Sequence, residues 1–288
     1  MIKLSPERPL GAALALMALW ASPAQAAGEG LVLAPHRAVY DMTLATARGG
    51  SGVTQVTGRM VYELTGSACE GYTQNMRFVT NMINQNGTGV VTDLRSWSWE
   101  DAGSKRFRFN SSQFRDERPT EATAGDATRG QTGGDVKVEL TKPAKKDLSL
   151  RSGVHFPIQH SMALLDAARA NKSVFRADLF DGSEKGEKVY DTISFIGRKQ
   201  PVGANRQLLA VKDAERLDTM PAWPVSIGYF EPGTDKKDAV PVYELSFLFF
   251  ENGVSRKLFI DYGEFAIQGE IKEIVFLEPG KCEPGTAR

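Results

Sequence analysis

Short runs of alternating apolar and polar residues dominate the chain from His36 onward. The runs are rich in Val, Thr, Tyr and Phe, and clusters of Gly, Asn and Asp separate them, a pattern typical of half-buried β-strands joined by turns. The expected strands are Ala38–Leu44, Val53–Thr65, Tyr72–Ile83, Val90–Glu100, Arg106–Phe114, Val136–Leu140, Val189–Ile196, Arg206–Leu217, Val225–Phe230, Tyr243–Phe250, Arg256–Tyr262 and Phe265–Leu277. The dipeptides Asn86-Gly87 and Asn252-Gly253 predict tight hairpin turns.

One stretch departs from this two-residue period. Pro157–Ala170 carries Ile158, Met162 and Leu165 at helical spacing, and a proline suits the first turn of a helix. The polar stretch Arg115–Asp135, rich in Thr, Gly and Asp, is expected to form a long loop. The pattern therefore predicts an all-β fold with one associated helix. Because so many strands must protect the edges of their sheet, a barrel-like or strongly curled sheet is favoured over a small sandwich.

The first 26 residues have the features of a cleavable signal peptide. Lys3 and Arg8 form a short basic region, Leu10–Trp20 is apolar, and Ala24-Gln25-Ala26 matches a cleavage box. We therefore expect residues 1–26 to be removed and residues 27–288 to form a single β domain. The protein would then be exported.

Export bears on the oxidation state of the two cysteines of the chain, Cys69 and Cys282. An even number of cysteines in an exported protein suggests a disulfide, although two unpaired buried thiols remain an alternative. A disulfide would close a loop of about 210 residues and would stabilise the fold by about 5 kcal/mol in the chain-entropy treatment.

Composition and charge narrow the classes of protein. The chain has 35 basic and 35 acidic residues and a formal net charge of zero, whereas a nucleic-acid-binding protein normally carries a basic surplus. No apolar run reaches the roughly 20 residues that a membrane-spanning helix needs. The sequence carries no phosphate-binding loop, nucleophile elbow, dinucleotide fingerprint or paired-cysteine motif, so neither a catalytic site nor a cofactor is predicted.

The three histidines are candidates for a metal site or for hydrolytic chemistry. His155 and His160 bracket the expected start of the helix, and His36 begins the first strand. A spacing of five residues does not place two ligands on one helical face, so no metal site is predicted.

Four aromatic residues are the candidates for a binding surface. Trp97 and Trp99 share one face of a strand, and Phe107 and Phe109 share one face of the next. If the turn brings these faces together, they form one aromatic cluster, whereas a shift of one residue pairs the tryptophans with arginines. The four residues would then form a core layer or line a concave surface for a ligand or partner.

A set of short motifs in a fixed order gives the chain a family resemblance. The motifs are Pro35–Tyr40, Gly58-Arg59, Cys69–Tyr72, Phe156–His160, Phe180–Gly182, Trp223–Val225, Tyr229-Phe230, Asn252–Val254 and Asp261–Gly263. Together they resemble the EipB family of periplasmic cell-envelope integrity proteins of Gram-negative bacteria. The resemblance implies a long antiparallel sheet coiled into an open spiral, with an associated helix and a disulfide that maps onto Cys69 and Cys282. It also implies a functional link with a periplasmic tetratricopeptide-repeat protein and no enzymatic activity.

Three hypotheses follow for the function. The first is a non-enzymatic periplasmic protein that supports envelope integrity under stress by binding another envelope component through its curved sheet. The second is a carrier of a lipid or other apolar ligand in the concave side of the sheet. The third is an envelope hydrolase that uses His155 or His160.

Overall fold

The computed structural model describes residues 31–131, 134–204, 211, 214–233 and 239–282. The predicted signal peptide, residues 1–26, lies outside these residues. The described chain forms fourteen strands, one α-helix and short 3₁₀ turns. The elements are β1 (His36–Ala47), β2 (Val53–Ser67), β3 (Gly71–Asn84), β4 (Gly89–Glu100), β5 (Arg106–Arg115), β6 (Arg118–Arg129), β7 (Val136–Lys142), β8 (Lys146–Leu150), α1 (Pro157–Arg169), β9 (Val174–Leu179), β10 (Tyr190–Ile196), β11 (Ala222–Phe230), β12 (Tyr243–Phe250), β13 (Ser255–Asp261) and β14 (Phe265–Phe276).

All fourteen strands belong to one antiparallel sheet in the order β8-β7-β6-β5-β4-β3-β2-β1-β14-β13-β12-β11-β10-β9. Consecutive strands are neighbours in the sheet except for β8 and β9, and β1 pairs with β14 and thereby joins the two halves. Strands β8 and β9 are the two ends of the sheet and do not pair with each other, so the sheet stays open. The prediction of an all-β fold with a long antiparallel sheet and one helix is confirmed.

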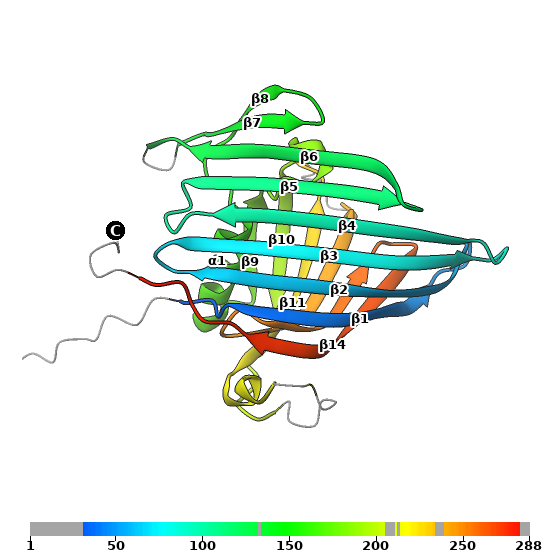
Figure 1. The fold of residues 1–288 in the computed structure, drawn as a ribbon. Coiled ribbons are helices and arrows are strands. Elements are labelled where there is room, and N and C mark those ends of the chain that lie inside the picture. The colour runs from blue at the N-terminus through cyan, green and yellow to red at the C-terminus, as the bar shows by residue number, and fades with distance from the viewer. Residues whose placement is uncertain (1–30, 132–133, 205–210, 212–213, 234–238, 283–288) are drawn as a thin grey trace, which may run out of the picture. The chain divides into compact units, whose positions relative to one another are not determined.

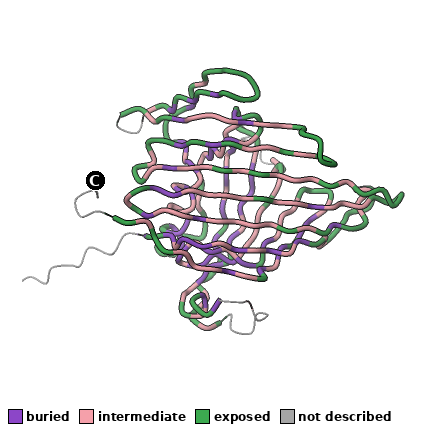
Figure 2. The backbone as a smooth tube through the Cα atoms, in the orientation of Figure 1, coloured by how far each residue is buried: buried purple, intermediate pink, exposed green. Residues whose placement is uncertain are grey.

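The sheet curls so that its two halves pack on each other. In Figure 1, β9–β11 pass behind the long strands β2–β5 and run steeply across them. One buried cluster contains Leu64 and Tyr72 from β2 and β3 together with Trp223 and Ile227 from β11. We call the face that carries these residues the inner face and the opposite face the outer face. Figure 2 shows β2–β4 coloured mostly as intermediate, so neither face of these strands is fully covered.

The helix α1 joins the two ends of the sheet, because the chain leaves β8, forms α1 and then enters β9. It begins at Pro157, as predicted, and ends at Arg169, one residue earlier than predicted. Its buried residues lie at helical spacing: Ile158, His160, Leu164, Leu165, Ala167 and Ala168. All of these except His160 belong to the inner cluster. The helix therefore covers the inner side of the sheet where its two edges approach.

Two expectations about elements were wrong. The stretch Arg115–Asp135 is mostly the strand β6 and not a loop, because the chain reverses at Asp116 and Glu117, both with positive φ, and then pairs with β5 and β7. The expected strand Arg206–Leu217 is not a strand where it is described: Glu215–Thr219 forms a 3₁₀ helix, with Leu217 buried. Residues 205–210 and 212–213 lie outside the described residues. The strands β8 and β9 were not predicted.

The predicted disulfide between Cys69 and Cys282 is present. The two Cα atoms are 5.7 Å apart, within the usual range for a disulfide. Cys69 lies in the turn between β2 and β3, and Cys282 follows β14. The connecting tail is held on the way, since Leu277 N–H donates to Pro35 C=O at 2.9 Å and Gly280 N–H donates to Gly66 C=O at 3.1 Å. The end of the chain is thus tied across β1 to the β2–β3 hairpin.

Candidate functional site

The register between β4 and β5 places the tryptophans and the phenylalanines on opposite faces of the sheet. Trp97 is opposite Asn110 and Trp99 is opposite Arg108, whereas Phe107 is opposite Glu100 and Phe109 is opposite Ser98. The turn sets this register, because the Asp101 carboxylate accepts from the N–H groups of Lys105 and Arg106, both at 2.6 Å. The four aromatic residues therefore do not form one cluster.

Phe107 and Phe109 lie on the inner face, in a closely packed aromatic group. Phe107 is fully buried and stacks on Phe109 and Phe156, with centroid distances of 5.4 and 5.2 Å, while Phe180 meets both rings edge-on. A Cβ atom at Gly182, which has φ +74°, would collide with the ring of Phe109. This group packs β5 against the ends of α1 and β9, and it leaves no room for a ligand between the rings.

Trp97 and Trp99 lie on the outer face. Trp97 is 40% exposed, and its direct cross-strand neighbours are Asn75 on β3 and Asn110 on β5. The guanidinium carbon of Arg108 lies 6.0 Å from the centroid of Trp99, a cation–π contact. A large exposed indole on the middle of a sheet face is the kind of side chain that interfaces bury.

An open groove of about 460 Å³ runs across the outer face beside Trp97. We call it the Trp97 groove. Besides Trp97 it is lined by Val61, Glu63, Asn75, Met76, Arg77, Arg95, Ser96, Asn110, Ser112 and Phe114. Its volume lies within the range of small-molecule sites, and it combines aromatic, amide and charged side chains.

Charged side chains on this face form two groups in which one aspartate binds two arginines. Asp93 accepts from Arg77 at 2.9 Å and from Arg95 at 2.7 Å, and Asp126 does so from Arg106 at 3.4 Å and Arg108 at 2.7 Å. Hydrogen bonds from Arg77 and Arg95 lower the pKa of Asp93 to about 2, so this carboxylate is charged at neutral pH. Each group therefore carries one formal positive charge.

Sequence analysis missed a buried carboxylate, Glu100, that holds the start of the helix. Its side-chain oxygens accept from Ile158 N–H at 2.8 Å, from Gln159 N–H at 3.0 Å and from the Ser104 hydroxyl at 2.9 Å. These backbone N–H groups belong to the first turn of the helix, where an N–H group has no acceptor within the helix. Glu100 thus caps α1 from a distant strand and fixes the helix to the sheet.

Arg129 completes this connection. It donates to Val154 C=O at 2.7 Å, to the Gln159 side-chain oxygen at 3.2 Å and to Ser104 C=O at 3.0 Å. The same guanidinium lies 4.8 Å from the centroid of Phe156, which is the N-cap residue of the helix. A half-buried arginine therefore connects β6, the β4–β5 turn and the start of α1.

Burial raises the pKa of Glu100 to about 7, although the hydrogen bonds from Ile158, Ser104 and Gln159 act in the opposite direction. The pKa of this carboxyl is higher in the folded protein than its ordinary value of 4.5, so its contribution to stability is complete at pH values below 4.5. This stability is lost as the pH rises through about 7.

We expect Glu100→Gln to remove that part of the pH dependence, because an amide does not titrate. Relative to the variant, the wild type should lose on the order of 3 kcal/mol of unfolding free energy across the window. Burial lowers the pKa of His155, and it lowers the pKa of His160 to about 4. Both histidines therefore make the fold more stable as the pH rises, which is opposite to the effect of Glu100. Urea unfolding of the wild type and of Glu100→Gln at a series of pH values isolates the contribution of Glu100, because both proteins contain the two histidines. Parallel pH profiles of the unfolding free energy would contradict the raised pKa of Glu100.

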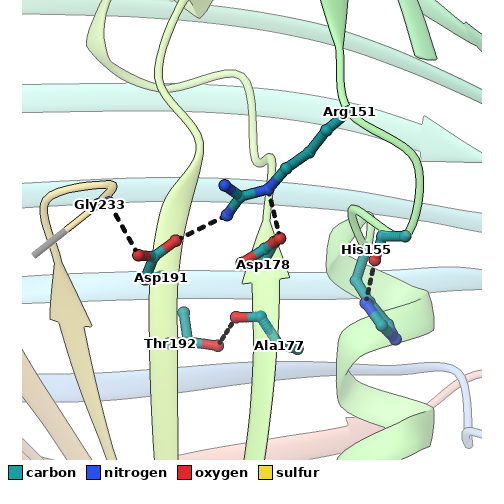
Figure 3. Close-up of polar contacts among 8 residues, drawn as sticks. Arg151, His155, Ala177, Asp178, Asp191, Thr192 and Gly233 are labelled. Atoms are coloured by element: carbon teal, nitrogen blue, oxygen red, sulfur yellow. Dashed lines mark hydrogen bonds and ion pairs between the residues drawn. The ribbon is translucent and has the colours of Figure 1, made fainter. Parts of the chain in front are cut away.

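Ion pairs join the two ends of the sheet beside the helix, as Figure 3 shows. Arg151, just after β8, donates to Asp178 of β9 at 2.6 Å and to Asp191 of β10 at 2.9 Å. The second oxygen of Asp191 accepts from Gly233 N–H at 3.1 Å. The groups are partly exposed, so these contacts orient the segments more than they stabilise the fold.

The histidines have structural partners. His160 is buried, and its Nε2 lies 3.1 Å from the Thr192 hydroxyl, whose proton goes to Ala177 C=O at 2.7 Å; His160 therefore donates this hydrogen bond. His155 Nδ1 contacts Gly153 C=O, and the His155 and His160 rings meet edge-on at 6.4 Å. His36 lies elsewhere, against Tyr62 and Phe276.

Among the described residues, no three His, Cys, Asp or Glu side chains gather in a way that would hold a metal ion. The helices in the same part of the chain include none that is both long and apolar enough to cross a membrane. The structure thus defines an open, curled antiparallel sheet with a tail tied by a disulfide and an aromatic, arginine-rich groove on its outer face.

Comparisons with known proteins agree with this class. A family model described as EipB-like matches residues 27–278. The cell envelope integrity protein EipB of Brucella abortus (strain 2308) is 36% identical over 272 residues, which cover 94% of each chain. A crystal structure of a beta-barrel-like protein of the domain of unknown function DUF1849, also from Brucella abortus, matches with a TM-score of 0.78 and 36% identity, over 85% of this chain and 99% of that one. The chain belongs to the EipB-like family.

Proposed function

We propose that this protein supports the integrity of the cell envelope from the periplasm, without catalysing a reaction, by binding another envelope component on the outer face of β3–β5. The relative from Brucella abortus carries envelope integrity in its name, which supports the general role. The disulfide between Cys69 and Cys282 suits an oxidising compartment, and the signal-peptide pattern of residues 1–26 suits export to it.

The observation that carries the proposed surface is the exposure of Trp97 beside the groove. Trp and Arg are the residues most enriched among those that dominate binding energy at interfaces, and this face presents Trp97 with Arg77 and Arg95. Hydrogen bonds to Asp93 hold both arginines in place before a partner arrives, which lowers the entropy lost on binding.

A complementation experiment tests this proposal. Cells that lack the protein should regain resistance to detergent with the wild-type chain but not with Trp97→Ala, at equal protein levels. Phe195→Ala is the matched control, since Phe195 is an exposed aromatic residue, 58% accessible, on the outer face of β10. Full resistance with Trp97→Ala, or an equal loss of resistance with both variants, would contradict binding of an envelope component on the outer face of β3–β5.

A second candidate function, the carrier of an apolar ligand, rests on the inner face. Met60, Phe78 and Leu94 are direct cross-strand neighbours there, and all three remain partly exposed. Partly exposed apolar side chains on the concave side of a curled sheet suit a lipid chain. Lipid extraction of the purified protein followed by mass spectrometry tests this: a stoichiometric lipid would support the carrier, and its absence after gentle purification would oppose it.

A further inference from the structure

We propose that the Trp97 groove binds an anionic glycan, with a sugar ring stacked on Trp97 and its acidic group held by Arg77 and Arg95. This inference rests on the proposed function, because it names the chemistry of the envelope component. It follows from the arrangement of side chains in two neighbouring rows across β2–β5.

The first row provides a platform for a sugar ring with hydrogen-bonding groups on both sides. Asn75, Trp97 and Asn110 are direct cross-strand neighbours on the outer face, and Glu63 continues the row onto β2. The electron-rich face of an indole attracts the polarised C–H groups on the flat side of a pyranose. Side-chain amides donate and accept hydrogen bonds, and a carboxylate accepts them, which matches the mixed needs of sugar hydroxyls.

The contacts within this row favour a preformed site. Asn75 Nδ2 lies 3.5 Å from Glu63 Oε1, a long hydrogen bond that orients the amide between the carboxylate and the indole. Glu63 is partly buried, whereas Asn110 is exposed, so the row is open toward β5. A ring on Trp97 would therefore meet Asn75 and Glu63 on one side and Asn110 on the other.

The second row provides the positive charge. Arg77 and Arg95 are cross-strand partners and lie next to the Trp97 row, with Ser112 beyond Arg95. The guanidinium carbon of Arg95 also lies 4.9 Å from the centroid of Phe114, a cation–π contact between two residues of the groove lining. Both arginines bind Asp93 through Nε and Nη2, and Nη1 takes no part in these bonds. Guanidinium groups suit carboxylates and phosphates.

The charge of the surrounding face favours an anion over a neutral sugar. The charged side chains that line the groove are Arg77, Arg95 and Glu63, and Asp93, which both arginines bind, brings the formal charge of these four residues to zero. The neighbouring group of Arg106, Arg108 and Asp126 gives this part of the outer face a net charge of one positive unit. Glu63 lies in the Trp97 row and not between the arginines, so the acidic group of the ligand belongs in the arginine row.

Two envelope sources share this chemistry: amino sugars that carry a carboxylate in the cell wall, and phosphorylated sugars of lipopolysaccharide. The test uses the mature full-length protein and isothermal titration with N-acetylmuramic acid, glucosamine phosphate and neutral N-acetylglucosamine. We expect one of the acidic sugars to bind and the neutral one to bind at least about tenfold more weakly. Sedimentation with peptidoglycan sacculi and with lipopolysaccharide vesicles then identifies the source.

Substitutions in each row distinguish the contribution of the Trp97 row to binding from that of the arginine row. Trp97→Ala should weaken binding of every sugar at least about tenfold, whereas Arg95→Gln should remove the preference for the acidic sugar and leave neutral binding little changed. Phe195→Ala should bind like the wild type. Binding that Trp97→Ala leaves unchanged, or the absence of any acidic preference, would overturn the inference.

The outcome also separates this inference from the proposed function. Loss of detergent resistance in Trp97→Ala without sugar binding by the wild type would reject the glycan and keep the binding surface; a protein captured there, such as a tetratricopeptide-repeat protein, would then be the occupant. Full resistance in Trp97→Ala would reject the proposed function itself.

Discussion

Replacing Phe107 with alanine is expected to lower the free energy of unfolding by about 3–5 kcal/mol, the range for truncating a fully buried Phe. Phe107 has no exposed surface and packs against Phe109, Phe156 and Phe180. Its loss would leave a cavity where β5 meets both the start of α1 and the segment after β9. The surrounding rings belong to a sheet and a helix that are fixed by other contacts, so the cavity cannot fully collapse.

Urea unfolding followed by circular dichroism measures this effect. Trp97→Ala is the control, because a partly exposed side chain on the outer face should change stability by less than about 1 kcal/mol. A Phe107→Ala variant as stable as the Trp97→Ala variant would contradict the assignment of inner and outer faces.

Removing the disulfide should have an effect of similar or greater size. Cys69 and Cys282 are 213 residues apart, and closing a loop of this length stabilises the fold by about 5 kcal/mol if the link acts only on the unfolded chain. The reduced protein should also lose order in its tail, since the bonds that Leu277 and Gly280 donate to Pro35 and Gly66 would remain there without the covalent link.

Unfolding of Cys69→Ser, Cys282→Ser and the double variant measures this contribution. The three variants should be destabilised equally, because either single change removes the same bond. Unfolding of the wild type with and without a reductant provides the comparison that involves no substitution. Stability unaffected by reductant would show that the tail, and not the disulfide, holds the end of the chain.

Much of the sheet could be predicted because its strands alternate clearly. Tyr243–Phe250 forms β12 with the predicted bounds, and Arg106–Phe114 differs from β5 by one residue. The helix was recognisable because it alone follows a helical period after a proline. Strand β6 was not recognised, since small and polar residues such as Thr123 and Ala127 face the interior in place of large apolar ones.

The candidate site was only partly predictable, because a register decides which side chains share a face. Residue spacing placed Trp97 with Trp99 and Phe107 with Phe109, but the turn at Asp101 determined that the two pairs lie on opposite faces. Glu100 gave no signal in the sequence, because the helix residues that it caps lie 58 and 59 residues further along the chain. Contacts at such separations depend on the curl of the sheet and not on local pattern.

Photo-crosslinking in living cells tests the central claim most directly, namely that the outer face around Trp97 contacts an envelope component. A photoreactive residue at the exposed position Asn110, beside Trp97, should give a discrete adduct that disappears when Trp97→Ala is added. The same residue at Phe195, on the outer face of β10, should give none of that adduct. Identical products from both positions, or an adduct at Asn110 that persists with Trp97→Ala, would contradict the account.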